Sequence, residues 1–327
     1  MSNNESNTEH YTLDRETVQI RLNKKEPIEQ LIKEITFRNF NNEVNIFIPG
    51  RFFPALSVTG TNCSLQCEHC NITYLSHMTD VSDENKLRKS LDKLVSSGAQ
   101  GCLISGGCDE DGKVPLLGYK DIFREYKEKT DLIFNFHVGL LNEEEIKRLA
   151  DIPPDIVSFD FTLDEEIIKN IYHLDKKSGD YIRTLENLTK RKIRVVPHIN
   201  IGLNYGSIKK EILTLEHLSK YEFDLIVFII LIPPKDDERF SEPRVEEIWK
   251  VLTEARLKFP KTELSLGCMR PRGNIRSEIE DVAIKAGINR FEIPLRKTIK
   301  KLTEKGMKLN TYHACCAIPL SLYRRQI

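Results

Sequence analysis

Three cysteines lie close together in the stretch TGTNCSLQCEHC (59–70), as Cys63, Cys67 and Cys70. Thiolate sulfur is a soft ligand that favours zinc, copper(I) and iron–sulfur clusters. Structural zinc sites usually take four protein ligands, often in C-x2-C pairs, and the C-x3-C-x2-C spacing fits them poorly. A four-iron cluster held by three cysteines leaves one iron open to a small molecule. The spacing therefore favours an iron–sulfur centre, with zinc or three packed core cysteines as alternatives.

Five further cysteines are spread along the chain. Cys102 lies inside a predicted strand and is expected to be a small core residue. Cys108 follows that strand directly, Cys268 ends a later strand, and Cys315 and Cys316 are adjacent in a tail. If the tail folds over the same end of the fold, three or four thiolates converge on a second metal centre. Packed or solvated cysteines are the alternative, and one of the adjacent pair is expected to be a spectator.

Three strand candidates carry polar residues two positions apart. These are Asn135 and His137, Ser158 and Asp160, and His198 and Asn200. Because side chains alternate between the two faces of a strand, the members of each pair share a face. Unpaired buried polar groups are costly, so three such pairs at one end of a sheet favour a polar ligand there. Hydrogen bonding among the pairs is the alternative.

Short apolar runs alternate with amphipathic, charged stretches from residue 53 onward. The strand candidates are 53–60, 101–107, 132–139, 156–162, 193–202, 224–232, 263–268 and 290–295. Eight strands with helical stretches between them predict an α/β fold, a (β/α)8 TIM-type barrel that is full or nearly full. The cysteine loop and the polar pairs fall near the carboxyl ends of these strands, where such barrels keep their active sites.

The barrel is expected to form one domain, because residues 51–300 contain no low-complexity linker. Residues 1–50 are predicted to be an N-terminal extension, disordered over 1–10 and then helical from the apolar spacing within 14–40. Residues 301–327 are predicted to be a C-terminal tail whose cysteines contribute to the second metal centre.

Charge and hydropathy limit the class of partner. The 327 residues include 49 basic and 49 acidic ones, and the net charge of zero argues against a nucleic-acid or membrane-surface binder. The N-terminus lacks the basic-then-apolar order of a signal peptide, and the apolar run 225–234 is too short to span a bilayer. A cytoplasmic protein is expected, in which cysteines serve as metal ligands more often than as disulfides.

The cysteine loop resembles the signature of the radical S-adenosylmethionine enzymes, with His69 at a position that is often aromatic in them. The resemblance extends over 53–300. It implies a [4Fe–4S] cluster on Cys63, Cys67 and Cys70, with S-adenosylmethionine bound to the open iron. An electron passed through the cluster would then cleave S-adenosylmethionine to a 5′-deoxyadenosyl radical.

The resemblance also implies where S-adenosylmethionine is held. ISGGCDEDG (104–112) matches a Gly-Gly loop that meets the methionine amino group, and glycine allows this close approach; Cys108 stands where an acidic residue often follows. HINIG (198–202) partly matches a stretch that flanks adenine. Apart from the resemblance, MRPRGNIR (269–276) is expected to bring Arg270, Arg272 and Arg276 to the same rim, to hold a carboxylate of S-adenosylmethionine or an acidic carrier domain, with a solvated basic loop as the alternative. The expected contacts are Gly106, Gly107, Asn135, His137, Asp160, His198, Asn200, Gly202 and Arg270.

Four stretches resemble the archaeal-type two-protein lipoyl synthases, often called biotin synthase-like: FPALSVTGTNC, CNITYLSHM, ISGGCDEDGKVPL and LGCMRPRG. This resemblance implies insertion of sulfur at C6 or C8 of a protein-bound octanoyl chain, with a second [4Fe–4S] cluster as the sulfur donor. The ligands of that cluster would come from Cys108, Cys268, Cys315 and Cys316.

The same resemblance implies three partners: an octanoylated carrier protein, a related synthase subunit and a low-potential electron donor such as a ferredoxin. Two alternatives stay open. One is a biotin synthase-like or other radical enzyme that acts on a free small molecule, and the other is a non-catalytic iron–sulfur or zinc scaffold.

Overall fold

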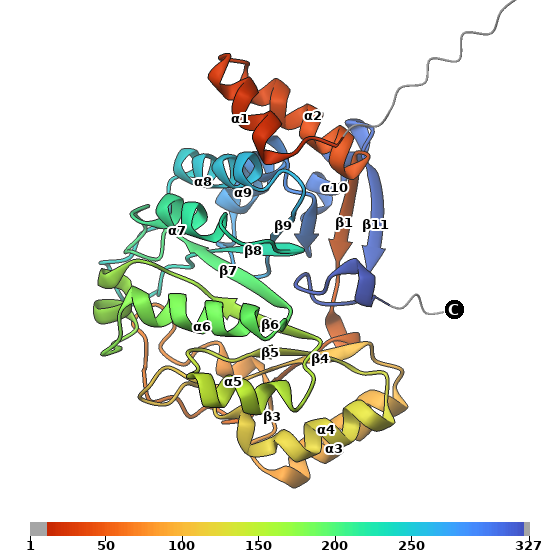
Figure 1. The fold of residues 1–327 in the computed structure, drawn as a ribbon, viewed down its shortest axis with the longest axis vertical. Coiled ribbons are helices and arrows are strands. Elements are labelled where there is room, and N and C mark those ends of the chain that lie inside the picture. The colour runs from red at the N-terminus through yellow and green to blue at the C-terminus, as the bar shows by residue number, and fades with distance from the viewer. Residues whose placement is uncertain (1–11, 324–327) are drawn as a thin grey trace, which may run out of the picture.

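A computed structural model describes residues 12–323, and the disorder expected for residues 1–10 lies outside this range (Figure 1). Within it, eleven strands form one curled sheet in the order β11-β1-β10-β9-β8-β7-β6-β5-β4-β2-β3. Every pairing between neighbouring strands is parallel. The predicted α/β class with a parallel sheet is therefore confirmed.

Eight of these strands overlap the eight strand candidates, one for one. They are β2 (Ala55–Ser57), β4 (Gly101–Ser105), β5 (Ile133–His137), β6 (Ile156–Asp160), β7 (Val195–Ile201), β8 (Leu225–Ile230), β9 (Glu263–Leu266) and β10 (Arg290–Glu292). Parallel strands are covered on both faces, so they read as nearly continuous apolar runs, which made them recognisable.

Three strands were not foreseen: β1 (Glu43–Phe47), β3 (Thr79–Asp80) and β11 (Lys308–Tyr312). β1 lies between β10 and β11, and β3 pairs with β2 at the other end of the sheet. Among the described strands the two edges, β11 and β3, do not pair, so the sheet curls without closing as an exact (β/α)8 barrel would. We call this curled sheet the open barrel.

Helices cover the outer, convex face of the open barrel (Figure 1). They are α3 (Glu84–Ser96), α4 (Lys120–Lys129), α5 (Glu143–Ala150), α6 (Ser178–Lys190), α7 (Glu211–Leu218), α8 (Val245–Lys258), α9 (Asn274–Lys285) and α10 (Arg296–Glu304). Two further helices, α1 (Arg15–Asn23) and α2 (Ile28–Phe40), lie at one end of the molecule and contact α8 (Figure 1). Local signals explain their bounds: α3 begins after Asp83, whose carboxylate accepts the N–H of Lys86, and α5 begins with a capping box of Asn142 and Glu145.

The strands present alternate residues to the helices and to the interior of the open barrel. On the outer side, Phe134 and Phe136 of β5 pack edge-on against Phe123 of α4, with ring centroids 5.7 and 5.1 Å apart. On the inner side, Ile133 and Leu225 begin their strands and pack against the C-terminal segment 314–318. The tail therefore fills part of the interior of the open barrel.

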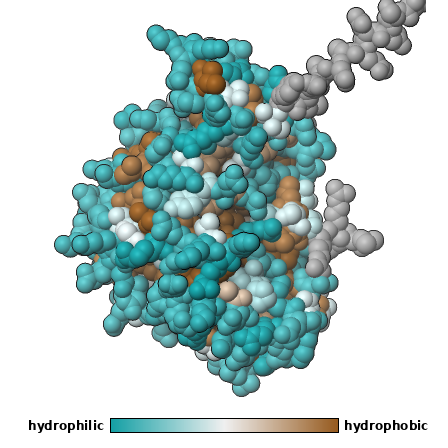
Figure 2. Space-filling view, viewed as in Figure 1, coloured by the Kyte–Doolittle hydropathy of each residue, from teal (hydrophilic) through white to brown (hydrophobic). Residues whose placement is uncertain are grey.

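Hydrophilic residues predominate on one face of the molecule, where the apolar residues lie in small groups (Figure 2). No helix within residues 12–323 combines the length and the apolar character needed to cross a bilayer. The expected cytoplasmic location stays a prediction.

Candidate metal and cofactor sites

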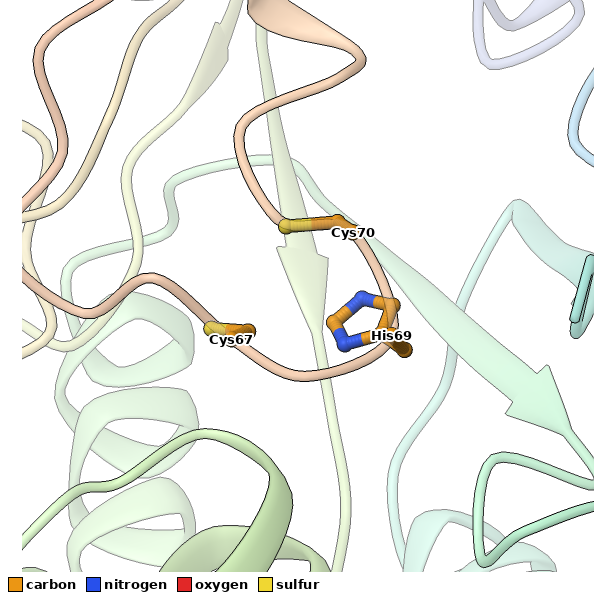
Figure 3. Close-up of side chains that lie close together, drawn as sticks. All are labelled: Cys67, His69 and Cys70. Atoms are coloured by element: carbon orange, nitrogen blue, oxygen red, sulfur yellow. The ribbon is translucent and has the colours of Figure 1, made fainter. Parts of the chain in front are cut away.

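The cysteine loop follows β2 at its carboxyl end. Cys67 is buried, whereas Cys63 and Cys70 are half-buried. The ligand atoms of Cys67, His69 and Cys70 all lie within 4.8 Å of one another, on one turn of the chain (Figure 3). Cys63 is close enough for its charge to act on Cys67 and on Cys108. The structure thus brings together the three cysteines predicted for the first cluster, which we call the first thiol group.

The thiols of this group differ in how readily they ionise. A hydrogen bond from Cys67 lowers the pKa of Cys70 to about 7, although burial opposes that shift. The same bond, together with burial, raises the pKa of Cys67. Metal ligands bind as thiolates, so Cys70 is better prepared to bind a metal than Cys67 is, and metal binding would release the proton of Cys67.

Contacts between loops hold the cysteine loop in place. Gln66, Asn71 and Ile72 adopt positive φ angles of 47°, 38° and 64°, which are uncommon for residues with a side chain. The carboxylate of Glu68 accepts a hydrogen bond of 3.0 Å from the hydroxyl of Tyr205. Such strained turns persist only where the surroundings impose them. Sequence reasoning missed Glu68, although a carboxylate between two of the cysteines was a visible signal.

The glycine loop after β4 packs directly against the cysteine loop. A Cβ at Gly107 would lie 2.0 Å from the carbonyl oxygen of Asn62 and 2.5 Å from Cβ of Cys63. The N–H of Gly107 donates to Oγ1 of Thr59 over 2.7 Å, and a Cβ at Gly106 would also meet this oxygen, at 3.0 Å. The two glycines therefore let the loops approach, and their expected contact with S-adenosylmethionine stays a prediction.

Cys108 borders the first thiol group. Its carbonyl oxygen accepts the N–H of Ser64 over 2.8 Å. Burial, and then the charges of Cys63 and Asp160, raise the pKa of its thiol to about 12. Cys102 is fully buried in the core, as predicted.

The three polar pairs form one wall at the carboxyl ends of β5, β6 and β7. Pairing between strands sets His137 beside Ser158, and Asp160 beside His198. The rings of His137 and His198 stack with centroids 5.8 Å apart. The predicted sharing of faces is therefore observed.

Some polar groups of this wall form hydrogen bonds or ion pairs with one another. Oγ of Ser158 donates to Oδ1 of Asn135 over 2.9 Å, and His137 contacts Asp160 over 3.0 Å. Oδ1 of Asn200, in contrast, is buried and has no hydrogen-bond partner among the described residues. Asn200 lines a cavity together with Asp160 and His198. The wall thus keeps unused hydrogen-bonding capacity at that cavity.

The pKa values of the wall residues, and of His69 in the cysteine loop, are shifted in different directions. Burial opposes ionisation of Asp160, but the charge and hydrogen bond of His137 outweigh it and lower the pKa of Asp160 to about 2. The pKa of His137 is raised, because Asp160 outweighs the opposing effect of burial. Burial lowers the pKa of His198, and that of His69, to about 4. At neutral pH these two imidazoles are uncharged.

Two expected cofactor contacts have packing roles in the structure. A Cβ at Gly202, where φ is +77°, would lie 2.3 Å from Cγ of Pro243. Arg270 is buried and donates to Glu280 over 2.9 Å and to the carbonyl of Glu292 over 2.7 Å. Its guanidinium therefore serves the protein interior, and a contact with S-adenosylmethionine stays a prediction.

Cys268, Cys315 and Cys316 form a second thiol group, next to Glu292 at the carboxyl end of β10. The ligand atoms of Glu292, Cys315 and Cys316 lie within 4.8 Å of one another. Cys268 is accessible to solvent, yet desolvation by the surrounding walls raises the pKa of its thiol, and the charges of Glu292 and Cys315 add to this effect. Sequence reasoning foresaw the thiols of this group but not the carboxylate.

Tyr74 is near both thiol groups. Burial raises its pKa, and the charges of Cys70 and Cys268 add to this effect. Cys108, expected to join the second centre, borders Cys63 and Cys70 instead.

No family model and no curated protein matches the sequence. Solved structures do match. Methylornithine synthase (PylB) has a TM-score of 0.60 and 15% identity, over 92% of this chain and 95% of that one. HydG, a maturase of the [FeFe]-hydrogenase, has a TM-score of 0.64 and 15% identity, over 95% and 74%. The HydG of Carboxydothermus hydrogenoformans has a TM-score of 0.62 and 15% identity, over 96% and 79%.

The chain therefore shares the fold of methylornithine synthase and of HydG. At 15% identity the likeness concerns the fold alone. The HMG-CoA lyase of Brucella melitensis also matches, with a TM-score of 0.50 and 10% identity over 82% of this chain and 92% of that one. The architecture by itself does not define a reaction, and the chemistry must be argued from the site. The likeness to two-protein lipoyl synthases stays a prediction.

Proposed function

We propose that the chain is a radical S-adenosylmethionine enzyme that inserts sulfur at C6 or C8 of a protein-bound octanoyl chain, as one half of a two-protein lipoyl synthase. One observation supports this most: the chain has two separate groups of thiol donors, and Tyr74 is near a member of each. One group can serve radical generation, and the other can serve sulfur supply.

The donor chemistry of the first thiol group fits a [4Fe–4S] cluster. It offers three thiols on one loop, and Cys70 ionises near neutral pH. His69, the remaining donor within reach, is neutral there. When bound, such a cluster with S-adenosylmethionine supplies a radical that can take a hydrogen atom from a C–H bond. The wild-type chain would hold the cluster with Cys63, Cys67 and Cys70.

The polar wall suits a charged, hydroxyl-rich cofactor. Asp160 keeps its negative charge through its pair with His137, and it can accept hydrogen bonds from ribose hydroxyls or an ammonium group. Asn200 offers a buried oxygen with no other partner among the described residues. These groups would bind and orient S-adenosylmethionine between the two thiol groups.

The second thiol group supports the finer part of the proposal. A carbon radical formed in the open end needs a sulfur source nearby, and Cys268, Cys315 and Cys316 can hold an iron–sulfur cluster there. An octanoyl chain is narrow, and a carrier protein outside the open barrel could deliver it into the interior. The carrier, the partner subunit and the electron donor belong to this proposal.

Cleavage of S-adenosylmethionine tests the radical chemistry. The protein is reconstituted anaerobically with iron and sulfide and reduced with dithionite, and 5′-deoxyadenosine is measured. Cys67→Ala should lower its formation at least about 100-fold, because the cluster loses a ligand. Cys102→Ala is the matched control, since Cys102 is a core thiol away from both groups. If Cys67→Ala still cleaved S-adenosylmethionine at the wild-type rate, the assignment of Cys67 as a cluster ligand would be wrong.

Product analysis tests the substrate. The reconstituted protein is given an octanoylated carrier peptide or dethiobiotin, with and without a candidate partner subunit, and the sulfur-containing products are identified by mass. Sulfur on the octanoyl chain is expected. Sulfur on dethiobiotin alone would favour an enzyme of free small molecules. Absence of 5′-deoxyadenosine in every mixture would favour a scaffold.

A further inference from the structure

Glu292 is a buried carboxylate without a counter-charge of its own. It ends β10, is 5% exposed and accepts hydrogen bonds from the N–H of Cys316, at 3.3 Å, and from its thiol. Within residues 12–323 it forms no ion pair, because the arginines on either side pair elsewhere: Arg270 with Glu280, and Arg290 with Glu263. Burial raises the pKa of Glu292, and a buried carboxyl group of this kind either keeps a proton or pairs with a cation. The donors that surround it indicate which cation it could take.

Soft metal ligands surround this carboxylate. The ligand atoms of Glu292, Cys315 and Cys316 are at most 4.8 Å apart, and Cys268 is close enough for its charge to act on Cys316. Donors bound at 2.0–2.3 Å in a tetrahedral site lie about 3.3–3.8 Å from one another. The three donors therefore need to close by only about 1 Å to bind a single metal atom.

Arg290 holds the tail so that these donors meet. It projects from the same face of β10 as Glu292, two residues away, and it is fully buried. Its guanidinium donates to the carbonyl oxygens of Cys316 and Ile318 and lies 4.2 Å above the ring of Phe47. The donor set is thus assembled by contacts that do not themselves require a metal.

We propose that Glu292 is a metal ligand, and that with Cys268, Cys315 and Cys316 it forms a second metal centre with a mixed carboxylate–thiolate donor set. Cys108 is not part of this centre. The nature of the metal as a sulfur-donating cluster rests on the proposed function, whereas the binding of a thiophilic metal by Glu292 does not. The two claims can therefore fail separately.

Metal binding is tested in a background that lacks the first centre, the full chain with Cys63→Ala, Cys67→Ala and Cys70→Ala together. After anaerobic reconstitution, iron, sulfide and zinc are measured per chain, with visible absorption, electron paramagnetic resonance and competition against a chelator. The background should keep its metal. Adding Glu292→Ala or Glu292→Gln should weaken retention at least about 10–100-fold. Cys108→Ala and Cys102→Ala, added singly, should retain it.

Glu292→Gln separates a ligand from a packing residue. Glutamine keeps the shape of the side chain and can still accept the N–H of Cys316, but it is a poor ligand. Full metal retention with an unchanged spectrum in Glu292→Gln would overturn the proposal. Glu292→Cys, which supplies a thiolate, should restore retention with an altered spectrum.

The background itself decides between the two claims. If it binds no metal, the second centre does not exist, although cleavage of S-adenosylmethionine by the wild type could still be intact. If it binds zinc without iron or sulfide, and loses the zinc in Glu292→Gln, the metal site stands and the sulfur-insertion function fails.

Discussion

The two thiol groups of this protein are built in different ways. The first lies on a single loop after β2, where Cys63, Cys67 and Cys70 are neighbours in sequence. The second is assembled from the end of β9, the end of β10 and the tail; Glu292 and Cys316 are 24 residues apart. One group depends on a turn, and the other depends on the packing of three segments.

This difference has consequences for stability and for function. The cysteine loop is held by neighbouring loops, through contacts such as that of Glu68 with Tyr205. The tail is held by Arg290 and by apolar packing inside the open barrel. Changes that release the tail should therefore harm the second thiol group and spare the first.

The largest expected effect separates the two groups by activity. Cys268→Ala should keep 5′-deoxyadenosine formation within about threefold of the wild type, while sulfur transfer falls at least about 100-fold. The physical reason is that Cys268 belongs with Glu292 and Cys315 and not with the cysteine loop. An equal loss of both activities would mean that the two groups act as one site.

The next effect concerns the anchor of the tail. Arg290→Met should lower the free energy of unfolding by about 3–5 kcal/mol, because it leaves Glu263 and two buried carbonyl groups without their donor. Urea denaturation measures it. Arg244→Met is the control: its ion pair with Glu246 is exposed, and a loss of at most about 1 kcal/mol is expected. Equal losses in both variants would show that Arg290 does not anchor the tail.

A smaller effect concerns the contact between the glycine loop and the cysteine loop. Gly107→Ala should lower the free energy of unfolding by about 1–3 kcal/mol, because its Cβ would overlap Asn62 and Cys63. The displaced loop should also lose iron from the first centre, while metal at the second centre remains. Gly118→Ala, with no atom within 4 Å of the added Cβ, is the control. Unchanged iron binding in Gly107→Ala would show that the loops can part without cost to the site.

The smallest effect concerns pH. Folding raises the pKa of His137, so its pair with Asp160 stabilises the protein fully below the unfolded value of about 6.5. That contribution is lost as the pH rises through the raised value, and on the acid side it declines toward the Asp160 pKa of about 2. His137→Gln should therefore cost about 1 kcal/mol near pH 5, since the pair is partly exposed, and less at pH 9. Thermal unfolding of protein without added metal measures this, and a cost that does not vary with pH would contradict it.

Much of the fold could be predicted from local patterns. All eight strand candidates are strands, because a strand covered on both faces must be apolar along its length. β11, with the sequence KLNTY, was not predicted for a physical reason. It is a partly exposed edge strand, and its polar residues interrupt the apolar run that marks a buried strand. β1 lies between β10 and β11, and this position depends on pairing between residues far apart in the chain. The open edges of the sheet, β11 and β3, depend on the same long-range pairing.

The candidate sites divide in the same way. The first thiol group and the shared faces of the polar pairs could be predicted, because loop spacing and strand alternation are properties of a few consecutive residues. The sequence could not show that Cys108 lies near Cys63 and not with Cys268, because this depends on how distant segments pack. Glu292 had a signal that was overlooked: with Arg290 it places two charges at alternating positions of an otherwise apolar strand.

Eight of the strands, the cysteine loop and the shared faces of the polar pairs follow from the sequence alone, because covalent geometry and side-chain alternation act over short distances. The entry of the tail into the open barrel, which brings Cys315 and Cys316 to Glu292, depends on tertiary packing. The reason is that this arrangement depends on apolar burial and on the hydrogen bonds of Arg290 to a segment 26 residues away. Neither of these is encoded in the spacing of the cysteines.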